Sequence, residues 1–199
     1  MTSLPNQALH PTAADPVLRP RVNARSLGVQ RGIVTPIPEA AAVLAGFVLA
    51  HAAWSASDLA EGDLLVPVAV VEVNGERRLL RFEAETQEQG IARGKSAMQD
   101  AMVTADAWAF ARDGLFERGG HKVDVLSIDF WAKGMPKPVT LVQEYQPFAR
   151  SGKFRIVGDP MVVVEGVAQA PAAVANVLEG VRAGIRSHPK VAGLWNSWR

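Results

Sequence analysis

The chain has 199 residues, of which 48% are hydrophobic and 21% are charged, proportions close to those of soluble globular proteins. Its formal net charge of +1 excludes a bulk electrostatic attraction to nucleic acid or to anionic membranes. The lack of cysteine excludes disulfides, thiolate catalysis and Cys-ligated zinc, and it favours a location in the cytoplasm.

Residues 4–16 read LPNQALHPTAADP and fit no folded pattern. This segment resembles the peptide produced when the recombination site at the edge of an integron gene cassette is translated. The resemblance covers only Leu4 to Pro16, and it implies membership of the mobile cassette proteins of unknown function, which are functionally diverse. Scattered prolines and the lack of a hydrophobic period predict that residues 1–34 are disordered or extended, and that a single domain spans residues 35–199.

A helix is expected to begin after Thr35 and to end near Leu59. The stripe that we interpret as its buried face contains Val43, Phe47, His51 and Trp54, with Leu44 and Val48 beside it. His51 is then a hydrogen-bonded core residue rather than a catalytic one. The apolar run 40–56 also resembles a signal or membrane helix, but its alanine content and its length of about 17 residues favour a core helix.

Asn74-Gly75 predicts a type I′ hairpin turn between strands over residues 64–73 and 76–84. With Val73 opposite Glu76, one face of the hairpin is apolar, and we expect it to be the core side. That face carries Leu65, Ala69, Val71, Leu80, Phe82 and Ala84. The other face, which includes Val68 and Glu72, is expected to be a solvated surface or a weakly apolar groove.

The stretch from Thr86 to Gln89 has the form of a capping box, and it predicts a long helix that ends at Gly119-Gly120. Strands are expected over 122–132 and 139–145, joined as a second hairpin. Residues 154–157 and 161–165 form one interrupted strand or two short strands. A final helix is expected to run from Pro171 to His188-Pro189.

The resulting order, α-β-β-α-β-β-β-α, predicts an α+β fold with an antiparallel or mixed sheet of about five strands and helices packed on one face. The double-stranded RNA-binding module contains part of this order. The chain does not match that module, because the predicted middle helix of this chain is too long and its lysines do not form a dense phosphate-binding cluster. We therefore do not expect nucleic acid as a partner, nor a membrane.

The sequence contains no GxSxG, HExxH, GxxxxGK[ST] or GxGxxG motif, so the commonest hydrolase, zinc-protease and nucleotide signatures are missing. The four histidines show no metal-ligand spacing, and no metal or cofactor is expected. Glu83, Glu85 and Glu88 could hold a cation, but a polar strand face and a helix N-terminus explain them more simply.

Arg112 falls on the sheet-facing stripe of the predicted long helix, where a guanidinium needs a partner. Asp129 and Glu144 are the candidate carboxylates. Together with Trp108 and Tyr145, such a pair could form the floor of a pocket for a small anionic or aromatic ligand. In the alternative, Arg112 lies near the helix C-terminus and reaches water.

Trp195 and Trp198 form an aromatic tail that must be covered, either by the chain's own helices or by a second subunit. The hydrophobic and aromatic features favour a noncatalytic small-ligand- or protein-binding domain that is homo-oligomeric. The alternative is a cofactor-independent hydrolase or isomerase that uses Arg112 with Asp129 or Glu144.

Overall fold

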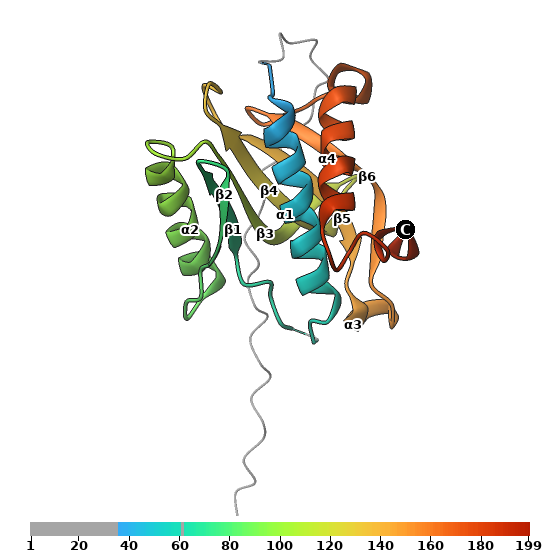
Figure 1. The fold of residues 1–199 in the computed structure, drawn as a ribbon. Coiled ribbons are helices and arrows are strands. Elements are labelled where there is room, and N and C mark those ends of the chain that lie inside the picture. Colours follow the sequence, from blue (N-terminus) through green and yellow to red (C-terminus); the bar gives the residue numbers. More distant parts are fainter. Residues whose placement is uncertain (1–35, 61) are drawn as a thin grey trace, which may run out of the picture.

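Seven antiparallel strands form one sheet in the order β2-β1-β3-β4-β5-β6-β7 (Figure 1). The structure, a computed structural model, describes residues 36–60 and 62–199, so the predicted N-terminal segment and Thr35 lie outside the described residues. The strands are β1 (Val68–Val73), β2 (Glu76–Arg81), β3 (Ala107–Arg118), β4 (His121–Ala132), β5 (Val139–Gln146), β6 (Arg155–Val164) and β7 (Val167–Ala168). The helices are α1 (Glu39–Ser57), α2 (Gln87–Ala101), α3 (Phe148–Ser151) and α4 (Ala175–Ser187), with 3-10 helices η1 (Pro171–Val174) and η2 (Trp195–Trp198). The α+β class and the antiparallel sheet are confirmed, but the sheet has seven strands instead of five.

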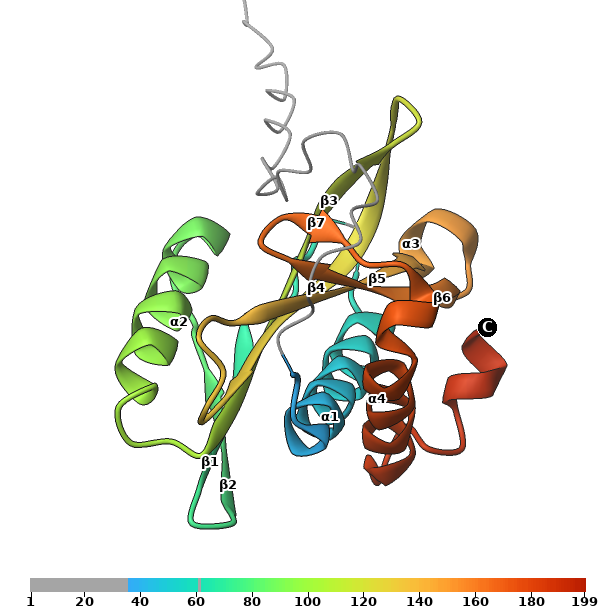
Figure 2. The same cartoon turned by 90° about the horizontal axis from the view of Figure 1, so that it is seen from above.

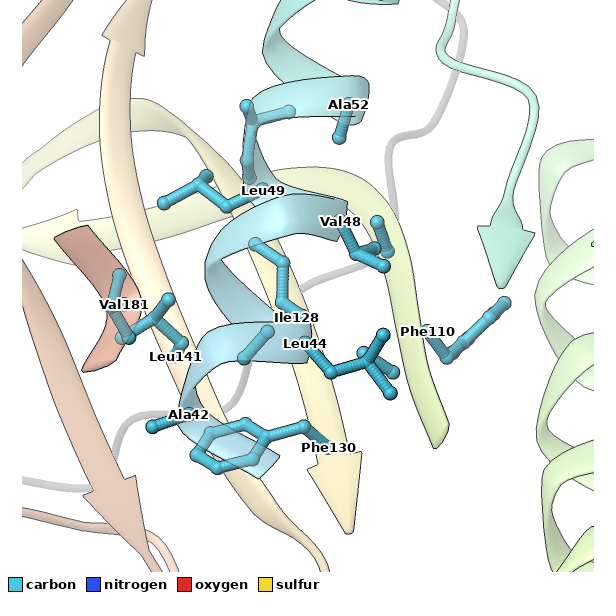
Figure 3. Packing of buried hydrophobic residues seen from close by; sticks show 14 of the residues in the cluster. Ala42, Leu44, Val48, Leu49, Ala52, Phe110, Ile128, Phe130, Leu141 and Val181 are labelled. Atoms are coloured by element: carbon cyan, nitrogen blue, oxygen red, sulfur yellow. The ribbon is translucent and has the colours of Figure 1, made fainter. Parts of the chain in front are cut away.

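The helices cover both faces of the sheet, which corrects the expectation that they pack on one face. Figure 2 shows α1 and α4 on one side of the sheet and α2 on the other. Successive side chains of a strand point to opposite faces of the sheet, so Ala109 and Phe110 of β3 face different helices. Phe110 lies against α2, where a Cβ on Gly94 would come within 2.3 Å of its ring. On the opposite side, Figure 3 shows Leu44 and Leu49 of α1 in the same core as residues of the sheet and α4.

The second half of the predicted long helix is strand β3, so that prediction is wrong beyond Ala101. The chain turns over residues 102–106, where the Asp106 amide donates to the Glu72 carbonyl at 2.9 Å and the Asp106 carboxylate accepts from the Asn74 amide at 2.6 Å. Alanines at 107, 109 and 111 gave the segment the appearance of a helix. Pairing with β1 and β4 on either side overrides this local preference.

The hairpin of β1 and β2 has the predicted register, with Val73 opposite Glu76 and Ala69 opposite Leu80. Asn74 and Gly75 both have positive φ, 52° and 79°, as a type I′ turn requires. Of the two alternatives for the second face, a solvated surface does not fit β1, whereas a weakly apolar groove agrees with the structure, since Val70, Arg77 and Leu79 of that face line a pocket. Val68 is only 2% exposed because helices cover both faces of β1, whereas β2 is an exposed edge strand along its whole length.

The C-terminal half follows the predicted elements closely. β4 and β5 form the second hairpin, and α4 ends immediately before His188. β6 is a single strand that runs through Gly158-Asp159-Pro160 opposite a register shift between Val142 and Glu144 in β5. The side-chain amide of Gln143 donates to the Val157 carbonyl at 3.0 Å and thereby ties the shifted strands together.

Helices α1 and α4 approach one another at the level of their backbones. A Cβ on Gly46 would lie 2.0 Å from the carbonyl oxygen of Val181, and a Cβ on Gly184 would lie 2.0 Å from the carbonyl oxygen of Val43. By length and composition alone, α1 could cross a membrane, but 61% of its apolar window is buried inside the domain. It is the core helix of this fold, as predicted.

Replacing Gly184 by alanine should destabilise the domain by about 1 to 3 kcal/mol, because the added methyl group forces α1 and α4 apart. Urea denaturation measures the change in the free energy of unfolding. Gly193→Ala is the matched control: a Cβ on Gly193 would meet no heavy atom within 4 Å apart from its chain neighbours, and we expect a change within about 0.5 kcal/mol. Equal effects of the two substitutions would contradict the close helix contact.

Candidate functional site

The predicted partnership of Arg112 and Asp129 exists, although Arg112 lies on a strand and not on a helix. Arg112 of β3 donates from Nη1 to Asp129 Oδ2 of β4 at 2.6 Å, and the two side chains are 13% and 19% exposed. The hydroxyl of Thr140 donates to the other oxygen, Oδ1, at 2.7 Å. The guanidinium carbon of Arg112 also lies 5.8 Å from the centre of the Phe110 ring. Both oxygens of Asp129 therefore have donors within the protein.

The other residues predicted for this site divide between three places. Trp108 and Asp129 line a cavity of about 210 Å³ beneath α2, and the indole Nε1 is buried without a hydrogen-bond partner among the described residues. Glu144 accepts from Arg118 at 3.0 Å, further along the strands. Tyr145 follows Glu144 on β5 and packs against Phe154, with ring centres 5.6 Å apart. The five-residue pocket predicted from the sequence is therefore not assembled.

The aromatic tail covers its own domain. Trp195 is only 8% exposed, and the ring of Trp198 lies 5.1 Å from that of Phe154 in an edge-to-face arrangement. Of the two alternatives left by the sequence, packing on the same chain accounts for most of the buried surface of the tail. A role for Trp195 and Trp198 at a subunit interface stays a prediction.

A different pocket, which we call the histidine pocket, has the features typical of a small-molecule site. Its volume is about 360 Å³, within the range of roughly 300 to 1,000 Å³ found for ligand pockets. It lies between α1, the β1–β2 hairpin and the segment that follows α4. Its lining consists of Phe47, His51, Trp54, Val70, Arg77, Leu79, His188, Pro189 and Lys190.

Four of the nine residues that line the histidine pocket carry aromatic rings. The centre of the Phe47 ring is 4.9 Å from that of His188, and the His51 ring is 5.9 Å from that of Trp54. Trp54 and Leu79 are 37% and 48% exposed, so two large apolar side chains of this pocket face solvent. A flat apolar molecule placed between them would remove this surface from water, which is favourable.

The hydrogen bonds of the two histidines indicate which ring nitrogen carries the proton in each neutral imidazole. The backbone N–H of Lys190 donates to His188 Nδ1 at 3.3 Å, so the proton of neutral His188 lies on Nε2. His188 Nε2 is 3.3 Å from His51 Nδ1 and donates to it. The proton of His51 must then lie on its own Nε2, for which the described residues provide no acceptor. The pair thus presents one unused N–H donor at an apolar pocket.

Burial favours the neutral form of both imidazoles. It lowers the pKa of His51 below the ordinary value of 6.5, and the positive charge of Arg81 lowers it further. Burial also lowers the pKa of His188, and the neighbouring His51 adds to this effect. His188 is 3% exposed and His51 is half-buried. Perturbed pKa values in a pocket are a recognised mark of functional sites.

A stripe that includes three of the lining residues was visible in the sequence but was assigned to the wrong surface. Phe47, His51 and Trp54 lie on the stripe of α1 that we interpreted as its buried face. The structure buries the residues beside the stripe, including Leu44 and Val48 as expected, but it leaves the stripe itself half-open. His188 carries no signal in the sequence, because it meets His51 only through the packing of α4 on α1.

Within the described part of the chain, no group of three or more His, Asp or Glu side chains could hold a metal ion. The two histidines alone would supply two ligands. Glu83, Glu85 and Glu88 are exposed and line a wider cavity of about 610 Å³ at the junction of β2 and α2.

No protein-family model, curated protein or solved structure matches this chain. The integron-cassette origin therefore stays a prediction from residues 4–16.

Acidification should destabilise the protein through the histidine pair. Because both pKa values are lowered in the folded chain, the unfolded chain takes up protons at a higher pH. The stability contributed by the neutral pair is fully present above about pH 6.5 and is lost as the pH falls below that value. Urea denaturation at about pH 7.5 and pH 5.5 measures this loss.

The double substitution of His51 and His188 by glutamine should make that pH dependence shallower. His121→Gln removes an exposed histidine at the start of β4 and serves as the matched control. The interpretation fails if the double variant and the control lose the same stability on acidification.

The partly buried ion pair can be tested separately. Arg112→Met leaves Asp129 with Thr140 as its remaining donor, and it should cost about 2 kcal/mol in the free energy of unfolding. Arg118→Met removes an arginine that is 71% exposed from the same strand, and should cost no more than about 0.5 kcal/mol. Thermal and urea unfolding of both variants would show whether the two ion pairs differ as expected.

Proposed function

We propose that this chain is a noncatalytic small-ligand-binding domain and that its ligand places a flat apolar ring in the histidine pocket. One observation carries the proposal: an apolar pocket of about 360 Å³ contains a histidine pair that is hydrogen-bonded, neutral and left with one unused donor. Apolar walls with a few convergent polar groups are typical of sites that bind small molecules.

The arrangement favours binding over catalysis. His51 and His188 are joined to one another, and the acceptor nitrogens of both rings are already occupied, by the Lys190 N–H and by His188. No free imidazole nitrogen remains to remove a proton from a substrate. A donor that orients a ligand is what this pair offers.

The enzyme alternative depends on Arg112 with Asp129 or Glu144. Its favourable observation is that Arg112 and Asp129 converge beside a cavity of about 210 Å³. However, both carboxylate oxygens of Asp129 already accept hydrogen bonds, one from Arg112 and the other from Thr140, so they are engaged within the protein. We therefore place this hydrolase or isomerase hypothesis second.

A cytoplasmic address and homo-oligomerisation remain predictions of the sequence. Phe148 and Leu194 are 52% and 44% exposed beside Trp198, which supports self-association or binding of a protein partner. Size-exclusion chromatography with light scattering would establish the oligomeric state.

Indole, a neutral flat probe, should bind the protein with a dissociation constant of about 0.1 to 1 mM, as expected for a ligand of its size. Leu79→Ala removes a pocket wall and should weaken binding several-fold. Leu80→Ala is the matched control, because Leu80 is the next residue of the exposed strand β2 and points to the other face of the sheet. Ligand-observed NMR and calorimetry measure both. Equal weakening by the two variants, or no binding of indole, would exclude the histidine pocket as the site.

A further inference from the structure

We infer that the ligand of the histidine pocket is an aromatic carboxylate. This inference rests on the proposed function and adds the chemical class of the ligand. It depends on two independent features of the pocket, namely the charges that surround it and the unused N–H donor of His51.

The charged groups around the pocket are predominantly positive. Arg77 and Lys190 line the pocket, and the positive charge of Arg81 on β2 lowers the pKa of His51. The lining contains no carboxylate. Both of these arginines are paired with acids: Glu72 accepts from Arg77 at 2.9 Å, and Glu83 lies 3.5 Å from Arg81. A cationic ligand is disfavoured by this environment, and an anion is favoured.

Lys190 is the cation that is available to a ligand. Arg77 is paired with Glu72, and its guanidinium carbon lies 5.6 Å from the centre of the Phe47 ring. Lys190 is exposed and forms no ion pair within residues 36–60 and 62–199. Its backbone N–H is bound to His188, which holds this residue at the pocket. Its ammonium group can therefore reach an anion at the pocket mouth without breaking an existing ion pair.

The donor of His51 demands an acceptor once a ligand displaces solvent from the pocket. An N–H that is buried without an acceptor is costly, so a purely apolar ligand would lose part of the free energy gained from its burial. A carboxylate oxygen satisfies this donor and gains a charge-assisted contact with Lys190 at the same time. The ring of the same molecule would occupy the space beside Phe47, Trp54 and Leu79.

Three probes that share one ring system but differ in charge test the inference. Indole is neutral, indole-3-acetate carries a carboxylate, and tryptamine carries an ammonium group at neutral pH. We expect indole-3-acetate to bind at least about tenfold more tightly than indole, and tryptamine to bind more weakly than indole. Raising the salt concentration from about 0.05 to 0.5 M should weaken indole-3-acetate only, because screening acts on the charge contact.

Lys190→Gln should remove most of the preference for indole-3-acetate over indole. Lys95→Gln is the matched control, since it removes another exposed lysine, at the cavity beneath α2. His51→Phe keeps a ring but removes the donor, and it should also reduce the preference. Both lysines are exposed, so thermal unfolding should show that these two variants remain folded.

Each outcome has a distinct meaning. If the three probes bind equally, the inference is overturned while the proposed function stands. If none of them binds, the proposed function fails as well. If indole-3-acetate is preferred but Lys95→Gln, not Lys190→Gln, abolishes the preference, the anion binds beneath α2 and the inference is overturned.

Discussion

The backbone contact between α1 and α4 is the constraint on which the histidine pocket depends. Gly46 on α1 and Gly184 on α4 each face a carbonyl oxygen of the other helix at a distance that no side chain would allow. Small residues four positions apart, Ala42 with Gly46 and Gly180 with Gly184, let the two backbones approach in this way. Because α4 is held against α1, the segment that follows α4 places His188 within hydrogen-bond distance of His51. A wider separation of the helices would break the hydrogen bond between the two imidazoles.

Burial on both sides of β1 and β3 explains the rest of the architecture. α1 lies over the alanines of β3, whereas α2 lies over Trp108 and Phe110 on the opposite face. The glycine at position 94 admits the Phe110 ring into the contact with α2. This arrangement also encloses the ion pair of Arg112 and Asp129. The carboxylate of Asp129 accepts hydrogen bonds from both Arg112 and Thr140. A charged pair that is fully bonded in this manner maintains strand alignment more readily than it performs chemistry.

The candidate site shows what kind of residue can be found from a sequence. Asp129 was one of two carboxylates that the sequence offered as partners for Arg112, because a sheet-facing guanidinium needs a carboxylate, a rule that holds on a strand as well as on a helix. Glu144 and Tyr145 cannot both lie at that pair, since neighbouring residues of β5 point to opposite faces. His51 was noticed as part of a stripe, but the side of α1 that is buried depends on where the sheet and α4 lie. His188 could not be predicted, because its partner is 137 positions away.

The sequence by itself determined the α+β class, the Asn74-Gly75 turn with its register, the cap at Thr86, the strands of the second hairpin and the end of the last helix. These features depend on local rules: the positive φ of a turn, the hydroxyl that caps a helix, alternation along a strand, and a proline that stops a helix. Only the tertiary structure decided that residues 107–118 form a strand, that helices cover both faces and that two distant histidines meet. The reason is physical, since burial on both faces erases the alternation of polar and apolar residues from which a strand is recognised, and contacts between distant segments leave no local pattern.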